Sequence, residues 1–208
     1  MIDSIFKFLQ VGGVFMIPLG LCSVISLTVM LERAFALRRT QILSDRLITL
    51  ITEMHGGGAF AHIQAAAEED HTPLGRLVLN SFRQLPFSKY ENTESLQTKA
   101  RGEISLMERG LVILEIIVGI APLLGLLGTI SGLITIFGDV SSKGQVATQG
   151  AQIAKGIAEA LNTTVAGLVV AIPSLIAYSI LSKRVESFAV EMENICMELL
   201  SKLYTSAK

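Results

Sequence analysis

The sequence predicts an all-α membrane protein with three transmembrane helices and long helices extending into the cytoplasm. Of its 208 residues, 50% are hydrophobic and only 17% are charged, and soluble domains are usually less apolar and more charged. Three apolar windows lie at 11–31, 111–137 and 157–181. Each can cross about 30 Å of hydrocarbon, which takes roughly 20 residues.

The first window, 11–31, follows a short N-terminal segment of residues 1–10. Lys7 is its one basic neighbour on the N-terminal side, and no small-x-small cleavage site follows the apolar run. Secretory signal peptides have a more basic N-terminal region, a shorter apolar core and such a cleavage site. We therefore expect a membrane anchor that stays on the protein.

Basic residues near the span ends predict the orientation. Seven lie on one side and three on the other. Because cytoplasmic flanks are enriched in Lys and Arg, residues 32–110 and 182–208 are expected in the cytoplasm. The N-terminus and the connection 138–156 are then outside. The cytoplasmic set is Arg33, Arg38, Arg39, Arg101, Arg109, Lys183 and Arg184, and the outer set is Lys7, Lys143 and Lys155.

The cytoplasmic segments have helical rather than alternating apolar spacing. We expect helices at 41–54, 59–69 and 74–85, the first broken by Gly56–Gly58. From about Glu91 to Leu114 no proline intervenes, so one helix is expected to run into the second span. The C-terminal segment is expected to be an amphipathic helix packed on its cytoplasmic neighbours. Its apolar stripe is Phe188, Met192, Ile195, Leu199 and Leu203.

The second and third spans each present one face of small and weakly polar residues, at steps of three and four. Thr129 and Thr164 are the hydroxyls at depth on these faces. Each lies about eight residues inside the outer end of its span, roughly 10–12 Å deep at about 1.5 Å per residue. Antiparallel neighbours would place both hydroxyls in one layer. The faces are Pro122, Gly125, Thr129, Gly132 and Ile136, and Thr164, Gly167, Ala171, Ser174 and Tyr178.

Two interpretations of these faces stay open. Small residues let membrane helices pack closely, and Gly128 and Gly132 form a GxxxG pair. A threonine can also satisfy its hydroxyl on its own helix. The alternative is a narrow, weakly polar pore lining, with Gly125, Gly132, Gly167, Ala171 and Ser174 as its small-residue wall.

Two carboxylates lie near the span ends rather than at depth. Glu115 precedes Thr129 by fourteen residues, and Glu159 lies one turn before Thr163. Either could form the mouth of an ion path, or an interfacial pair with Arg109 or Lys155. A proton relay needs a titratable group at depth. The chain supplies none there, so a partner would have to bring the carboxylate.

Several functions are not indicated. The net charge of −1 gives no case for a nucleic-acid partner. Cys22 and Cys196 have no metal-ligand spacing, and no disulfide between them is expected. The three histidines His55, His62 and His71 are interpreted as solvated surface residues. Without a nucleophile–base set or a cofactor motif, we expect neither an enzyme nor a bound cofactor or metal.

The motifs APLLGLLGTISG (121–132) and AEALNTTVAGLVVAIPSLIAY (158–178) resemble those of the MotA/TolQ/ExbB proton channel family. One span, a cytoplasmic helical domain, two spans and a cytoplasmic tail is a layout similar to ExbB and TolQ, whereas MotA has four spans. By this resemblance Thr129 and Thr164 match the pore threonines, and Glu159 matches a glutamate at the outer end of the pore. Glu115 is a weaker match. Asn162-Thr163 departs from the expected apolar pair, and helical phase favours Thr164 over Thr163.

The resemblance implies a ring-shaped homopentamer in the bacterial inner membrane. Its second and third spans would line a pore around two ExbD- or TolR-like subunits, each with one span and a membrane aspartate. Proton flow through this motor would drive work on a TonB- or TolA-like protein. The alternative function is a non-conducting scaffold whose small-residue faces only hold helices together.

Overall fold

The computed structural model describes residues 14–53, 60–143 and 150–206. In these ranges the regular secondary structure is helical, which confirms the all-α prediction. The backbone divides into two compact units. The first contains Met1–Glu32 and Gly110–Ser179, and the second contains Arg33–Arg109 and Ile180–Lys208. The predicted N-terminal segment 1–10, His55 and the glycine triplet lie outside the described residues.

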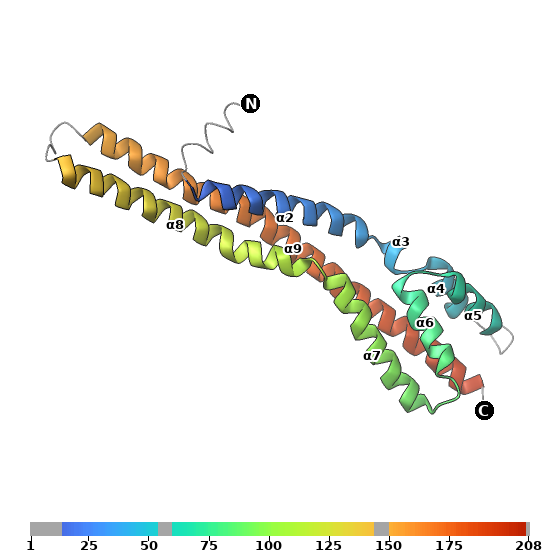
Figure 1. Ribbon diagram of the computed structural model, residues 1–208. Helices are drawn as coiled ribbons and strands as arrows, with labels where there is room; N and C mark the ends of the chain where they lie inside the picture. The colour runs from blue at the N-terminus through green and yellow to red at the C-terminus, as the bar shows by residue number, and fades with distance from the viewer. Residues whose placement is uncertain (1–13, 54–59, 144–149, 207–208) are drawn as a thin grey trace. The chain divides into compact units, whose positions relative to one another are not determined.

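The first unit is built from most of α2 (Met16–Ala36), from α8 (Leu111–Lys143) and from the first part of α9 (Gly150–Ser206). Figure 1 labels these three helices. Each of these three helices is long and apolar enough to cross a membrane. The three predicted spans are therefore confirmed as candidate membrane helices. Much of the predicted connection 138–156 is helical, and residues 144–149 lie outside the described part of the chain.

Side chains from all three helices form the core of the first unit. Met16 and Leu19 of α2 pack with Ile117 and Ala121 of α8 and with Ala171 of α9. Yet only 33% of the apolar window of α8 and 28% of that of α9 is buried. Many of the remaining Leu, Ile and Val side chains are exposed, and such a surface is typical of contact with lipid or other protein chains.

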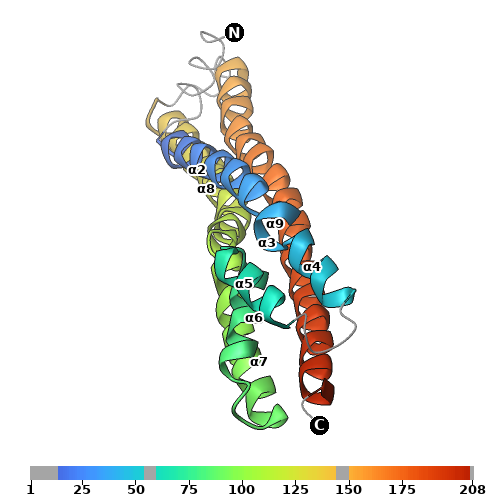
Figure 2. The ribbon, with the colours of Figure 1, turned by 90° about the vertical axis from the view of Figure 1, so that its right-hand side faces the viewer.

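Among its described residues, the second unit contains five shorter helices and the last part of α9 (Figure 2). Two of the helices begin at side-chain caps. The Thr72 hydroxyl accepts from the Gly75 N–H at 3.1 Å, with Pro73 in the first turn, and Ser88 forms a capping box with Glu91. These caps satisfy backbone donors that have no partner within the helix. The five helices are α3 (Arg39–Ile42), α4 (Asp45–Thr52), α5 (Phe60–Glu69), α6 (Pro73–Arg83) and α7 (Lys89–Glu108).

The predicted helix 41–54 is wrong in detail, because the chain forms α3 and α4 there instead. Leu43 and Ser44 between them are extended. Leu43 is 1% exposed, so its burial in the unit outweighs helix continuity. The Ser44 side chain makes no capping hydrogen bond at the start of α4.

The predicted continuous helix from Glu91 to Leu114 is also wrong. The helix α7 ends at Glu108 and α8 begins at Leu111. Gly110 between them has φ of 91°, a left-handed conformation that glycine adopts without steric cost. By contrast, the third span and the C-terminal segment form one helix, α9, with 57 residues.

The predicted apolar stripe of the C-terminal segment packs inside the second unit, to which this segment belongs. Met192, Leu199 and Leu203 are buried, whereas Phe188 and Ile195 are half-buried. Tyr204 near the end of α9 donates to the Phe87 carbonyl at 2.9 Å. The amphipathic pattern therefore identified the packing side of this helix.

Candidate functional site

The small-residue faces of α8 and α9 pack against each other in the first unit. A Cβ on Gly125 would lie 2.9 Å from the Thr163 carbonyl oxygen, and one on Gly167 would lie 2.6 Å from that of Ala121. A Cβ on Gly132 would meet the Cβ of Ala160 at 2.9 Å. Glycine therefore lets the two backbones approach more closely than any larger residue would.

This close approach brings Thr129 and Thr164 together. Their hydroxyls form a direct hydrogen bond between α8 and α9. The Thr129 hydroxyl also lies 3.1 Å from the Gly125 carbonyl and 3.3 Å from that of Ala160, while Thr164 Oγ1 lies 3.3 Å from the Gly125 carbonyl. Thr129 is buried and Thr164 is half-buried.

The chemistry of the Thr129–Thr164 pair follows from its groups. A hydroxyl both donates and accepts, so a pair can pass a proton along by reorienting. It cannot hold a net charge near neutral pH, so it needs an acid or base beside it. Residues 116–138 and 160–182 contain no Asp, Glu, His, Lys or Arg.

Thr163 and Thr164 point to different neighbours. Thr163 is 1% exposed, and its methyl group would lie 2.4 Å from a Cβ on Gly128. Thr164 is the one that bonds Thr129, in agreement with the helical phase of the third span.

Further along α9 than Thr164, Ser174 makes a contact that was not predicted from the sequence. Its hydroxyl and that of Ser26 in α2 are 2.6 Å apart, and both residues are buried. Ala171, one turn before Ser174, belongs to the core of the unit. A serine inside an apolar span was the signal, since a buried hydroxyl needs a partner.

The carboxylates lie apart from the Thr129–Thr164 pair. Glu115 is exposed, and its fourteen-residue separation from Thr129 corresponds to about 21 Å along α8. Glu159 pairs with Lys155 at 3.8 Å, and its side chain is 39% exposed. The structure therefore contains the ion pair with Lys155 that was part of one interpretation of Glu159.

Glu159 also lines a groove of about 410 Å³ between α8 and α9, which we call the Glu159 groove. Its hydroxyl-bearing lining residues are Ser131, Thr135 and Thr163. The remaining lining residues are Val14, Phe15, Gly128, Gly132, Ile136, Gly156 and Ala160.

The second unit holds a buried ion pair and a separate pocket. Glu103, 3% exposed, accepts from Arg76 Nε at 2.9 Å, and Lys99 lies 3.6 Å away. Burial by itself would raise the pKa of Glu103, but hydrogen bonds and charge from Arg76 and Lys99 bring that pKa below its ordinary value. Glu103 and Arg76 were not identified from the sequence, because they are twenty-seven residues apart.

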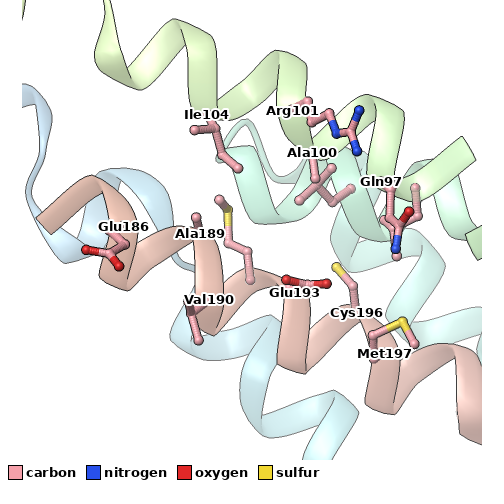
Figure 3. A pocket seen from close by; sticks show the side chains of 13 residues that line it. Gln97, Ala100, Arg101, Ile104, Glu186, Ala189, Val190, Glu193, Cys196 and Met197 are labelled. Carbon is pink, nitrogen blue, oxygen red and sulfur yellow. The ribbon is translucent and has the colours of Figure 1, made fainter. Parts of the chain in front are cut away.

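The pocket of about 330 Å³ in Figure 3 lies between α7 and α9. Arg101 and Gln97 line it from α7, and Glu193 and Met197 line it from α9. Burial raises the pKa of the Cys196 thiol in this pocket to about 12, so the thiol stays protonated and unreactive near neutral pH.

The model of the MotA/TolQ/ExbB proton channel family matches residues 69–194, more than half of the chain. The chain belongs to this family. Both motifs that carried the resemblance, 121–132 and 158–178, lie inside the matched range.

Some of the relatives are named ExbB and others TolQ. The Synechocystis protein named ExbB-like 1 is 34% identical over 196 residues, which cover 90% of this chain and 77% of the relative. The biopolymer transport protein ExbB of Aquifex aeolicus is 35% identical over 133 residues, 61% of this chain and 88% of the relative. The Tol-Pal system protein TolQ of Haemophilus influenzae is 35% identical over 105 residues, 50% of this chain and 45% of the relative.

Proposed function

We propose that this chain is a proton-channel stator subunit that couples the proton motive force to work on envelope proteins, as in ExbB and TolQ systems. The observation that carries the proposal is the Thr129–Thr164 hydrogen bond between two apolar helices. It places two relay-competent hydroxyls together within candidate membrane spans. Membership of a proton channel family supports the same function.

The acid of the channel would come from a partner. The Thr129–Thr164 pair cannot hold a proton by itself, and the apolar stretches of α8 and α9 contain no Asp or Glu at depth. A partner of the ExbD or TolR kind, with one span and a membrane aspartate, would supply the missing group. The half-buried Thr164 would face it from this chain.

The assembly would be a homopentameric ring in a bacterial inner membrane, with α8 and α9 around the partner. The N-terminus would lie outside, and residues 32–110 and 182–208 would lie in the cytoplasm. The exposed apolar surfaces of α8 and α9 support burial against lipid and neighbouring copies. The driven protein would be of the TonB or TolA kind, and we propose no enzymatic activity for the chain.

Paired substitutions at Thr129 and Thr164 test the channel. Valine keeps the volume of threonine but removes the hydroxyl, whereas serine keeps the hydroxyl. We expect Thr129→Val and Thr164→Val each to reduce proton uptake into vesicles containing the whole complex by about tenfold, roughly the effect of one lost hydrogen bond. The serine variants should retain most of the uptake.

Full uptake in both valine variants and in the double variant would overturn the channel assignment. The native mass of each complex controls for assembly. In cells, Thr129→Ala and Thr164→Ala should each abolish energised work while the complex persists.

A non-conducting scaffold is the second candidate, favoured by the close contacts of Gly125 and Gly167 with the opposite backbone. A scaffold would tolerate both valine variants. It would instead lose assembly when Gly125 or Gly167 is replaced by a bulky residue. The channel also predicts that second loss, so the valine variants decide between the two.

A further inference from the structure

We infer that the turn between α6 and α7 is a docking site for an acidic, apolar segment of a soluble protein. This turn covers residues 84–88 of the second unit. Leu85 and Phe87 in the turn and Tyr90 just after it are 38%, 55% and 78% exposed. We call these three side chains the turn patch. They take no part in the proposed channel, so docking here would be a further function.

Polar groups of the second unit restrain the turn that carries the patch. A capping box of Ser88 with Glu91 fixes the end that leads into α7. The Tyr204 hydroxyl donates to the Phe87 carbonyl at 2.9 Å, and the fully buried Asn92 amide donates to that hydroxyl at 3.2 Å. The end of α9 accordingly lies beside this turn in Figures 1 and 2. A surface that is already ordered loses little conformational entropy on binding.

The exposed side chains of the patch are of a kind that binds proteins. Aromatic residues are enriched in interfaces, and a few of them usually contribute most of the binding energy. Phe87 and Tyr90 combine high exposure with a restrained backbone. They are therefore the expected anchors of a partner.

Two cations beside the patch favour an acidic partner. Arg83 is the last residue of α6 and Lys89 is the first of α7, and both are exposed. Among the residues that the structure describes, no carboxylate forms an ion pair or hydrogen bond with either side chain. The neighbouring Glu91 carboxylate instead accepts from the Ser88 N–H and hydroxyl. Carboxylates on a partner would complement the two free cations.

A soluble segment fits the patch better than lipid or a second copy does. The 20 residues of α7 place about 30 Å of helix between the patch and the start of the candidate span α8. A second copy docked patch to patch would bring Arg83 and Lys89 against their like-charged equivalents. Three apolar side chains and two cations also form a surface for one peptide segment, since stable domain interfaces use about 20–30 residues a side.

Peptide binding to the complete complex tests this docking site. The probes are two short fluorescent peptides with the same leucines and phenylalanines, one with glutamates and the other with lysines at the polar positions. Their anisotropy is measured with the complex in phosphatidylcholine nanodiscs. We expect the acidic peptide to bind about tenfold more tightly than the basic one, and the double variant Arg83→Glu with Lys89→Glu to reverse this preference. Phe87→Ser should weaken binding of the acidic peptide about tenfold or more.

Two matched variants on α7 outside the patch serve as controls. Leu106 is 56% exposed and Arg101 is exposed as well. Leu106→Ser and Arg101→Glu should leave the affinity for the acidic peptide unchanged, and native mass verifies that every variant assembles. Phe87→Ser should also keep the wild-type proton uptake, so a failure of the channel and a failure of this docking site are separate results.

Equal affinities for the two peptides would overturn the docking site, and so would losses that the control variants reproduce. Displacement of the acidic peptide by soluble dihexanoyl phosphatidylglycerol would assign the patch to a lipid headgroup instead. Association of complexes with one another that Phe87→Ser abolishes would assign it to a second copy. Either result would rule out a soluble acidic segment as the occupant.

Discussion

Gly167 lies where α9 approaches the backbone of α8, and alanine there should be destabilising. Its Cβ would lie 2.6 Å from the Ala121 carbonyl oxygen and 3.2 Å from Gly125 Cα. Forcing a methyl group into such a contact costs about 1–3 kcal/mol. Gly119→Ala is the matched control, since its Cβ would meet nothing within 4 Å. Thermal unfolding in detergent should show a lower Tm for Gly167→Ala and an equal or higher Tm for Gly119→Ala.

A second residue-level prediction concerns the buried pair of Glu103 and Arg76. The pKa of Glu103 is lowered, so its stabilising contribution is present above its ordinary pKa of 4.5 and is lost as the pH falls through the lowered value. Glu103→Gln should cost about 2 kcal/mol at pH 7. Losses of about 3–5 kcal/mol occur when fully buried pairs are broken, but Arg76 is 42% exposed.

Thermal unfolding of wild type and Glu103→Gln between pH 7 and pH 3 checks this prediction. The difference in Tm should be largest at pH 7 and should shrink below pH 4.5. A difference that stays constant across this range would show that Glu103 contributes through packing rather than charge.

At the scale of elements, the junction of α7 and α8 depends on the left-handed backbone of Gly110. Alanine at φ of 91° is strained by about 1–2 kcal/mol. Gly102→Ala, inside α7 and with nothing within 4 Å of its Cβ, should instead stabilise by up to about 1 kcal/mol. The two variants should therefore shift Tm in opposite directions. A higher Tm for Gly110→Ala would mean that the chain prefers one continuous helix here.

The length of α9 lets this one helix belong to both units. Its 57 residues are nearly three times the roughly 20 that cross a bilayer. The part from residue 180 onward buries Val185, Met192 and Leu199 within the second unit. The same helix therefore contributes an apolar span to one unit and an amphipathic packing face to the other.

For the whole molecule, the exposed apolar surface predicts association. Leu123, Ile134 and Val169 are each more than 60% exposed in the isolated chain. Native mass spectrometry of the detergent-solubilised complex should give about five times the 22.4 kDa of one chain, with additional mass when the single-span partner is present. A monomer that remains dispersed in lipid nanodiscs and still conducts protons would contradict the ring.

Much of the fold could be predicted from local patterns. Three apolar windows and helical spacing identified the candidate spans, and the buried Met192 and Leu199 lie on the stripe that was expected to pack. The breaks at Leu43 and Gly110 could not be predicted in this way. The first break accompanies the burial of Leu43 and the second the left-handed backbone of Gly110, and an apolar period reports neither property.

The sequence by itself determined the chemistry available to this protein: apolar helices with small-residue faces, one threonine at depth on each, and no acid beside them. Those properties are local, because composition and helical period decide them. Only the tertiary structure decided that Thr129 bonds Thr164, that Thr163 and Glu159 share a separate groove, and that Arg76 neutralises Glu103. The Thr129–Thr164 bond depends on how closely α8 and α9 approach, and Gly125, Gly132 and Gly167 at their contact allow that distance.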